Sequence, residues 1–239
     1  MTYLFSLSKK YVLDLLFPPF CVGCSSEGTF LCALCRSRLQ WVHPKCFCCG
    51  MLMPAGVQRP AGRTCLSCQG DSSIYAFLSP FSFEQECVRE LIHALKYRRV
   101  RDISILLASF LFEYIAYFSL SIPENALLIP IPLHKKRKRI RGFNQAERIA
   151  WHFGRSIGIE TRTDVLQKIK STVSQVELLS HQRKENVKGV FSVAHSESVF
   201  GRTVILLDDV KTTGATLEEA ARTLKESGAK RVWAITFAH

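Results

Sequence analysis

The chain has 239 residues, of which 47% are hydrophobic and 22% are charged; this composition excludes an intrinsically disordered protein and allows one sizeable core with a small module beside it. The 32 lysine and arginine residues outnumber the 20 acidic ones and give a formal net charge of +12, which favours a polyanionic partner such as nucleic acid, an anionic membrane face or a phosphate-rich substrate over a basic protein without a special partner. Since no secretory signal precedes the ten cysteines, we expect a cytoplasmic protein whose paired cysteines bind metal.

The first twenty residues predict an amphipathic helix that ends before Pro18 and Pro19. Their apolar run is broken by Lys9, Lys10 and Asp14, and no small-residue cleavage site follows. A secretory leader is therefore not indicated.

Eight cysteines before residue 70 stand in four CxxC pairs. Two residues between cysteines let both thiolates of a tight turn reach one zinc ion at about 2.3 Å, and four thiolates close a tetrahedral structural site with no open position for catalysis. We therefore expect two structural zinc sites. Sequential pairing joins the first pair to the second and the third to the fourth, although a crossed pairing is also compatible, and Cys48 leaves the register of the third pair ambiguous. The pairs are Cys21/Cys24, Cys32/Cys35, Cys46/Cys49 and Cys65/Cys68.

The composition changes after the cysteine pairs. Gln69–Ser73 is typical of a linker, and cysteine nearly disappears beyond it. We therefore predict an N-terminal helix and double zinc ribbon over residues 1–70, and a second domain over residues 71–239.

Beyond the linker, apolar residues at helical spacing predict helices over 88–95 and 146–157, with Gly158 ending the second. Residues 103–122 are almost wholly apolar, which is the length of a membrane-spanning helix. Glu113 in their middle is expensive at the centre of a bilayer. We therefore expect a buried helix and no membrane span.

The later part of the chain predicts a parallel sheet. A helix is expected over 216–227, between two strands, and a strand–helix–strand unit of this spacing requires parallel pairing. The polar stretch 167–190 is expected to form a long loop. Short apolar runs predict strands over 126–131, 204–207 and 231–237.

The run from Val204 to Thr216 carries the clearest chemistry. Its strand brings two carboxylates to the edge at which open α/β sheets bind ligands. A hydroxyl-rich turn then enters a helix whose first N–H groups and dipole suit a phosphate. The carboxylates suit the hydroxyls of a sugar or a bound Mg²⁺. The run thus predicts a ribose-5-phosphate site made of Asp208, Asp209, Lys211, Thr212, Thr213, Gly214, Ala215 and Thr216.

This run resembles the signature of the type I phosphoribosyltransferases: four apolar residues, two acidic ones, then a loop similar to Thr212–Thr216. The resemblance implies an α/β fold with a parallel sheet flanked by helices. It implies that Asp208 and Asp209 face the ribose 2′- and 3′-hydroxyls of 5-phosphoribosyl-1-pyrophosphate (PRPP). It also implies that Thr212–Thr216 hold the 5-phosphate and that Mg²⁺ accompanies the diphosphate.

Further motifs lie in the segments Leu95–Tyr97, Ile129–His134 and Arg141–Glu147 and at the separate residues Thr172, Gln175, Leu178, Arg183, Asn186, Gly189 and Phe191. They are similar to those of the ComF/GntX competence family, in which a double zinc ribbon precedes a phosphoribosyltransferase domain. This resemblance implies action on incoming single-stranded DNA in natural transformation. Two residues depart from the family pattern: Lys211 stands where the loop is usually apolar, and Cys48 is an additional cysteine.

Six of the seven residues from Lys135 to Arg141 are basic. Because the pyrophosphate loop of type I phosphoribosyltransferases lies at the corresponding place, these residues are expected either to grip pyrophosphate or to follow a DNA backbone with salt-dependent affinity; a solvated face is the alternative. Phe143 and Tyr97 can stack bases, although core packing is favoured for Phe143. The basic residues are Lys135, Lys136, Arg137, Lys138, Arg139 and Arg141.

Three functions follow as hypotheses. The first is a competence protein that binds single-stranded DNA and PRPP. The second is an active phosphoribosyltransferase on an unidentified acceptor, and the third is a zinc-dependent adaptor for other DNA-uptake proteins. Salt-sensitive DNA binding separates the first from the third, and pyrophosphate release in the presence of an acceptor separates the second from both.

Overall fold

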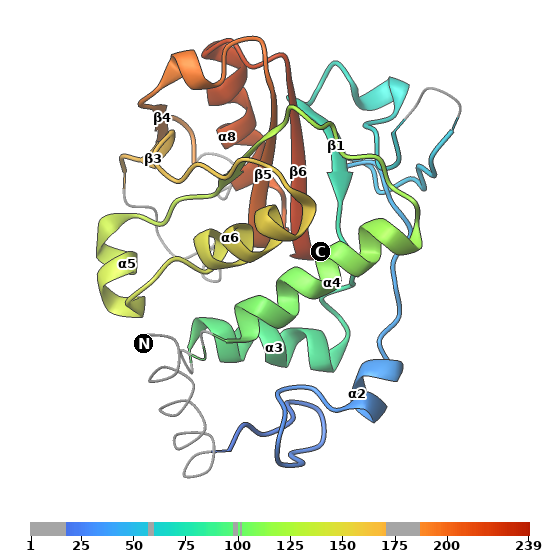
Figure 1. Cartoon of the computed structure of the whole chain (residues 1–239). Coiled ribbons are helices and arrows are strands. Elements are labelled where there is room, and N and C mark those ends of the chain that lie inside the picture. Colours follow the sequence, from blue (N-terminus) through green and yellow to red (C-terminus); the bar gives the residue numbers. More distant parts are fainter. Residues whose placement is uncertain (1–17, 57–59, 98–99, 101, 171–186) are drawn as a thin grey trace.

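Four parallel strands form the central sheet, in the order β1–β6–β5–β2 (Figure 1). The computed structural model describes residues 18–56, 60–97, 100, 102–170 and 187–239. The strands are almost continuously apolar and buried, as expected where a parallel sheet is covered on both faces. Their bounds are β1 Ile74–Leu78, β2 Leu127–Pro130, β5 Thr203–Val210 and β6 Arg231–Ala238.

The register of the sheet brings the ends of β5 and β2 to one edge. Thr203 pairs with Arg231 and Val210 with Ala238, while Pro130 pairs with Leu207 on the other side of β5. The three strands predicted from apolar runs are thereby confirmed, and β5 extends through both predicted carboxylates to Val210.

Helices α4 and α6 cover one face of the sheet, and α3 packs against α4. The predicted apolar stripes of α3 and α6 are buried in one core with α4. Asn144 caps α6 by accepting a hydrogen bond from the Ala146 N–H (3.1 Å). Gly158, at φ 70°, ends α6 in the left-handed conformation, as predicted. The bounds are α3 Glu86–Lys96, α4 Ile103–Tyr117 and α6 Gln145–Ile157.

The other face carries α8 (Ala215–Glu226) and an antiparallel pair, β3 (Leu166–Lys168) with β4 (Phe191–Val193). The loop predicted over 167–190 therefore starts later than expected, because Gln167 and Lys168 belong to β3. Residues 171–186 lie outside the described residues, and so do the motif positions Thr172, Gln175, Leu178, Arg183 and Asn186. The predicted N-terminal helix over 1–17 also lies outside them. The remaining short elements are α2 Ala33–Ser37, η1 Leu66–Cys68, α5 Lys135–Arg141 and η3 Ser196–Ser198.

Helix α4 is the apolar segment that raised the membrane alternative. It ends at Tyr117, and its Glu113 carboxylate accepts hydrogen bonds from Arg36 Nη2 (2.5 and 2.6 Å), a residue of α2. Among the described residues, no helix combines the length and the apolar character needed to cross a bilayer. Glu113, which interrupts the apolar run, thus attaches α4 to the segment that carries the cysteine pairs (described residues 18–56 and 60–70), called the cysteine segment below.

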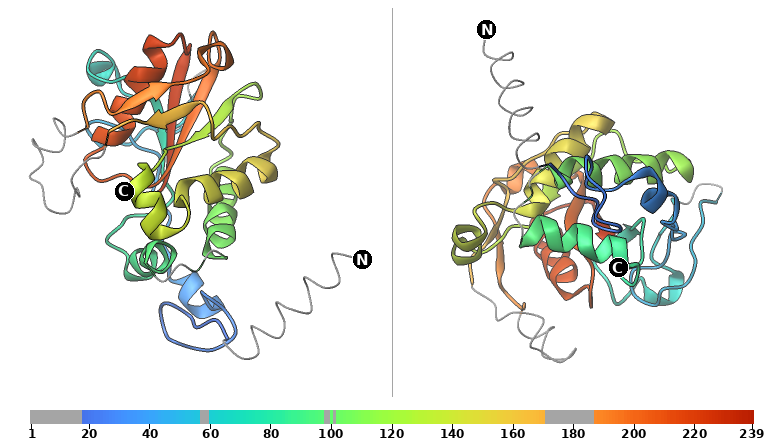
Figure 2. Two further views of the ribbon diagram at one scale, coloured as in Figure 1. Left: turned by 90° about the vertical axis from the view of Figure 1, so that its left-hand side faces the viewer. Right: turned by 90° about the horizontal axis from the view of Figure 1, so that it is seen from below.

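The cysteine segment contributes residues to the cores on both faces of the sheet. Its first half packs with α3 and α4, since Cys21, Leu31 and Cys35 belong to their core. Its second half runs beside β1 (Figures 1 and 2), where the Phe77 N–H donates to the Gly62 carbonyl at 2.8 Å.

Candidate functional site

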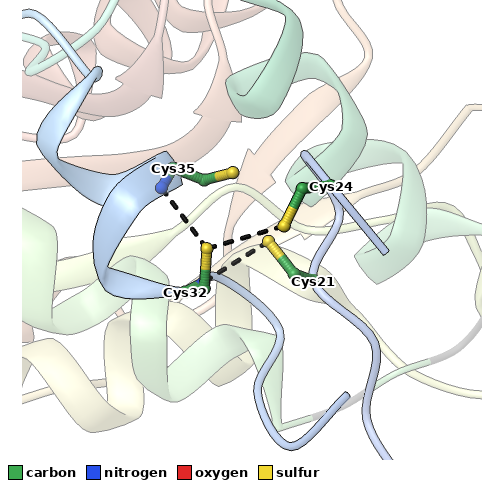
Figure 3. A group of neighbouring side chains, drawn as sticks. All are labelled: Cys21, Cys24, Cys32 and Cys35. Atoms are coloured by element: carbon green, nitrogen blue, oxygen red, sulfur yellow. Dashed lines mark hydrogen bonds between the residues drawn. The ribbon is translucent and has the colours of Figure 1, made fainter. Parts of the chain in front are cut away.

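The eight paired cysteines form two clusters, and the sulfurs group in the sequential order. Within each cluster the four sulfur atoms lie within 4.8 Å of one another. Cys24 Sγ and Cys32 Sγ are 3.6 Å apart in the first cluster (Figure 3), and Cys49 Sγ and Cys65 Sγ are 3.7 Å apart in the second. Four ligands about 2.3 Å from a tetrahedral centre lie about 3.8 Å from each other. Both clusters therefore have the donor set and the spacing of a closed structural zinc site.

Backbone N–H groups favour the thiolate form in each cluster. The Cys32 N–H points to Cys21 Sγ at 3.3 Å, and the Cys65 N–H to Cys46 Sγ at 3.4 Å. Burial raises the pKa of these two thiols, but the N–H groups around them outweigh it and lower the pKa of Cys21 and of Cys46 to about 6. Thiolates are the zinc-binding form, so Cys21 and Cys46 are suited to bind metal near neutral pH, whereas burial raises the pKa of Cys35 and hydrogen bonds with neighbouring thiols raise the pKa of Cys68.

Zinc removal is expected to unfold the cysteine segment, because metal-binding free energy in such small modules, about 10–16 kcal/mol in zinc-finger peptides, is folding free energy. Native mass spectrometry should find two zinc ions per chain, and one in C35S. C87S is the matched control, since Cys87 belongs to neither cluster and should leave both ions in place. A C35S protein that keeps two ions would contradict the assignment.

A cleft of about 480 Å³ opens at the carboxyl ends of β5 and β2. This size is typical of a small-molecule site. Its walls come from α3, the segment after β2, α5, the start of α6, β3 and the loop before α8. The polar and aromatic residues that line it include Glu90, His93, Lys96, Tyr97, Arg137, Arg141, Gln145, Lys168, Asp208, Asp209, Thr212 and Thr216.

The two predicted carboxylates lie in the floor of this cleft in different environments. Asp209 is buried and pairs with Lys96, with 2.8 Å between Oδ2 and Nζ. Burial and the neighbouring Asp209 charge raise the pKa of Asp208 to about 7, although Lys96, the Asp209 N–H and Lys168 act in the opposite direction. Asp208 Oδ1 accepts a hydrogen bond from the Asp209 N–H at 2.8 Å. One carboxylate is thus held by a cation, and the other is poised to gain or lose a proton near neutral pH.

The predicted phosphate loop connects β5 to α8. Thr212 and Thr216 line the cleft. Gly214, at φ 79°, is the N-cap of α8, and the Ala215 N–H lies 3.4 Å from Thr213 Oγ1. A phosphate bound at this turn would meet the positive end of the α8 dipole.

Lys211 takes a different direction from its neighbours. It does not line the cleft; its Nζ lies 5.0 Å from the ring centroid of Phe47 and 5.4 Å from that of Phe77. The structure therefore brings Asp208, Asp209, Thr212 and Thr216 together at the cleft but turns the side chain of Lys211 toward the cysteine segment.

The basic run forms α5, with His134 Nδ1 accepting from the Lys136 N–H (3.3 Å) and Gly142 as the left-handed C-cap. Arg137 and Arg141, four residues apart on one side of the helix, line the cleft. Lys138 pairs with Glu147 at 3.0 Å. The four basic residues that are exposed and do not line the cleft are Lys135, Lys136, Lys138 and Arg139.

Several cleft residues were not predicted as site residues. Lys168 reaches the cleft from β3, and burial lowers its pKa. Lys96 and Gln145 lie in the motifs Leu95–Tyr97 and Arg141–Glu147, which was the available signal for them. Gln145 is buried and its Nε2 has no hydrogen-bond partner, so a donor is available at the cleft.

The two aromatic candidates, Phe143 and Tyr97, lie in different environments. Phe143 is buried in the core with α3, α4 and α6, as favoured from the sequence. Tyr97 is 59% exposed and lines the cleft. Its ring lies 5.6 Å from the guanidinium carbon of Arg141. Of the two candidates, Tyr97 is therefore the one whose aromatic face a ligand in the cleft can reach.

Comparison with known proteins identifies both parts of the chain. Residues 12–69 match the family model of the double zinc ribbon domain, and residues 141–239 match that of the phosphoribosyl transferase domain. The parallel sheet flanked by helices is the fold expected for the second of these.

Two relatives align with most of this chain, and a third aligns with about half of it. "Competence protein ComFC" of Bacillus subtilis is 30% identical over 216 residues, covering 87% of this chain and 78% of that protein. "DNA utilization protein YhgH" of Salmonella typhi is 29% identical over 214 residues, covering 86% and 89%. "Competence protein F" of Haemophilus influenzae is 36% identical over 119 residues, covering 48% of this chain and only 51% of that protein.

Among solved structures, a glutamine PRPP amidotransferase from B. subtilis aligns with a TM-score of 0.35 at 19% identity, over 57% of this chain and 25% of that one.

Proposed function

The chain belongs to the ComF/GntX competence family, and from this membership we propose that it acts on incoming single-stranded DNA during DNA uptake and binds PRPP in the cleft. One observation supports the proposal: two carboxylates, the predicted phosphate loop and several basic side chains line the same cleft. We propose a division into a helix and double zinc ribbon over 1–70 and a phosphoribosyltransferase-like domain over 71–239, located in the cytoplasm.

The cleft offers a partner to each part of PRPP. The loop Thr212–Thr216 and the N-terminus of α8 would hold the 5-phosphate. Asp208 and Asp209 would accept hydrogen bonds from the ribose hydroxyls. The diphosphate, accompanied by Mg²⁺, would lie toward Arg137 and Arg141, whose planar guanidinium groups match phosphate oxygens. We assign no residue to the chemical step.

The two interpretations of the basic run, pyrophosphate binding and DNA binding, apply to different sides of α5. The side with Arg137 and Arg141 faces the cleft, which suits pyrophosphate. The exposed side, with Lys135, Lys136 and Arg139, suits a DNA backbone, where each neutralised phosphate releases counterions. One short helix thereby links the two ligands.

Phosphoribosyl transfer is a second candidate function. The observation that favours it is the wall formed by α3, which adds Glu90, His93 and Tyr97 to the cleft. An acceptor there would bond to ribose C1 as the bond from C1 to the pyrophosphate oxygen breaks, and pyrophosphate would leave with Mg²⁺. Pyrophosphate release that depends on an added acceptor would support this function. The adaptor role remains the third candidate, with other DNA-uptake proteins docked on the ribbon.

The test of DNA binding is a titration of labelled single-stranded DNA across a salt series, with and without PRPP and Mg²⁺. We expect affinity to fall with salt, with a log–log slope of about −0.7 for each phosphate contacted. In the variant K135Q/K136Q/R139Q, the slope should become shallower by about 2, because three contacts are lost. Absence of DNA binding at low salt would refute the DNA reading and favour the enzyme or the adaptor.

A further inference from the structure

The second cysteine cluster is joined to the phosphate loop by Phe47, the residue between Cys46 and Cys48. Phe47 is 5% exposed and packs edge to face on Phe77 of β1, with ring centroids 5.5 Å apart. A Cβ atom added to Gly214 would lie 2.7 Å from Phe47 Cζ. The ring therefore lies directly against the backbone of the phosphate loop, at the residue that caps α8.

Lys211 adds a second link on the same side. A Cβ at Gly214 would also lie 3.2 Å from Lys211 Cε, and the Lys211 ammonium lies over the rings of Phe47 and Phe77. The ammonium thus lies over the residue between Cys46 and Cys48. Four thiolates around one Zn²⁺ carry a net charge of −2, so a metal-loaded cluster attracts the cation. The aliphatic part of the Lys211 side chain packs against Gly214 of the phosphate loop.

The end of the cysteine segment gives a third link. Glu218, in the first turn of α8, accepts hydrogen bonds from Ser72 Oγ (2.7 Å) and from the Ser73 N–H (2.6 Å). These serines follow Cys68, the last ligand of the second cluster. The second cluster thus lies next to the phosphate loop through Phe47, and the serines that follow its last cysteine hold the first turn of α8.

The first cluster has other neighbours. A Cβ at Gly23 would lie 2.7 Å from Cys87 Sγ of α3, and Arg36 pairs with Glu113 of α4. Val22, which takes the place of Phe47 in the first CxxC turn, packs in the core with α3 and α4. The two clusters therefore support different parts of the fold.

We propose that Phe47 is a positioning residue for the phosphate loop, and that the second four-cysteine site, by fixing Phe47 and Lys211, sets the affinity of the cleft for a phosphorylated sugar. The first site has no such effect. The inference rests on the proposed binding of PRPP. Small displacements of positioned groups commonly change ligand affinity by an order of magnitude or more.

The test compares wild-type protein with F47A, F47L and the matched control V22A, all loaded with zinc. Calorimetric titration with PRPP and Mg²⁺ should give a dissociation constant about tenfold higher for F47A, partial recovery for F47L and no change for V22A. Zinc content and the thermal midpoint are measured in parallel, because a merely structural role would lower the midpoints of F47A and V22A without separating their affinities.

A second experiment needs no variant of Phe47 and remains decisive if F47A does not fold. In wild-type protein loaded with ¹¹³Cd, PRPP and Mg²⁺ should shift the resonance of the second site and leave that of the first unchanged, since coupling between two ligands is reciprocal. Selective loss of one resonance in C35S assigns it to the first site. Equal affinity of F47A, or no shift at the second site in a protein that binds PRPP, would overturn the inference. Failure of wild-type protein to bind PRPP would instead refute the proposed function on which it rests.

Discussion

Replacing Asp208 with asparagine should weaken PRPP binding by about 100-fold and at the same time stabilise the protein by about 1–2 kcal/mol at pH 8. Both effects follow from the position of Asp208 beside Asp209 in the floor of the cleft. Burial and Asp209 raise the pKa of Asp208 to about 7 from an ordinary value of 3.8. The folded protein therefore holds a proton between about pH 4 and pH 7 that the unfolded chain has released, so its stability falls as pH rises through this window.

An asparagine has no such titration, so the stability gain of D208N should be largest above pH 7 and vanish near pH 4. Wild-type affinity for PRPP should rise between pH 6 and pH 8, as the carboxylate that accepts hydroxyl hydrogen bonds forms, whereas D208N should show no rise. Calorimetry and denaturant unfolding at pH 5.5 and pH 8 measure both quantities.

The neighbouring substitution D209N is the matched control, with an opposite expected sign for stability. Asp209 pairs with Lys96 at 2.8 Å, and loss of a charged hydrogen bond costs about 1.5–3 kcal/mol. D209N should therefore destabilise the protein, whereas D208N should stabilise it. Equal destabilisation by both changes would show that Asp208 is held by favourable partners rather than strained by burial.

The second large effect is expected from the two arginines that line the cleft. The double variant R137Q/R141Q should lower affinity for PRPP by about 100-fold or more, because two hydrogen bonds from charged donors, each worth about 1.5–3 kcal/mol, are lost. Arg141 also orders its surroundings: its Nη1 donates to Gln145 Oε1 at 3.2 Å. Calorimetric titration with PRPP and Mg²⁺ measures the change.

The comparison with K135Q/K136Q/R139Q separates the two sides of α5, since the two variants remove two and three positive charges from opposite sides of one helix. R137Q/R141Q should reduce PRPP binding strongly and single-stranded DNA binding slightly, and the other variant should do the reverse. If both variants lose both ligands to the same extent, DNA and the sugar phosphate share one surface, and the proposed division of the helix is wrong.

The strands and the helices of the sheet could be predicted because their residues satisfy local requirements. The apolar run Val204–Leu207 is followed by carboxylates and a glycine that begins a helix, and Gly158 ends another helix, so pattern and fold agree there. The helix Lys135–Arg141, which places Arg137 and Arg141 on one side, was not predicted, because the run was compared with a pyrophosphate loop.

Other features depend on contacts that are distant in sequence. The direction of Lys211 is set by Phe47 and Phe77, which come from the ribbon and from β1, so no pattern in the loop itself reveals it. Lys168 stands in a polar stretch without periodicity and reaches the cleft only because β3 pairs with β4. The grouping of the cysteine pairs is likewise a property of the fold, since identical CxxC spacings permit either pairing.

The place of β6 in the sheet has a consequence for how the chain folds as it is synthesised. β6 lies between β1 and β5 and is the last of the four strands in chain order (Figure 1). Ile74 therefore remains without its neighbour Val232 until almost all of the sheet's residues have left the ribosome. Such non-local pairing makes folding slow and exposes an apolar edge in the meantime. Zinc binding by the cysteine segment requires only residues that are synthesised earlier. The ribbon can therefore fold first and present an ordered surface for β1 before β6 has been synthesised.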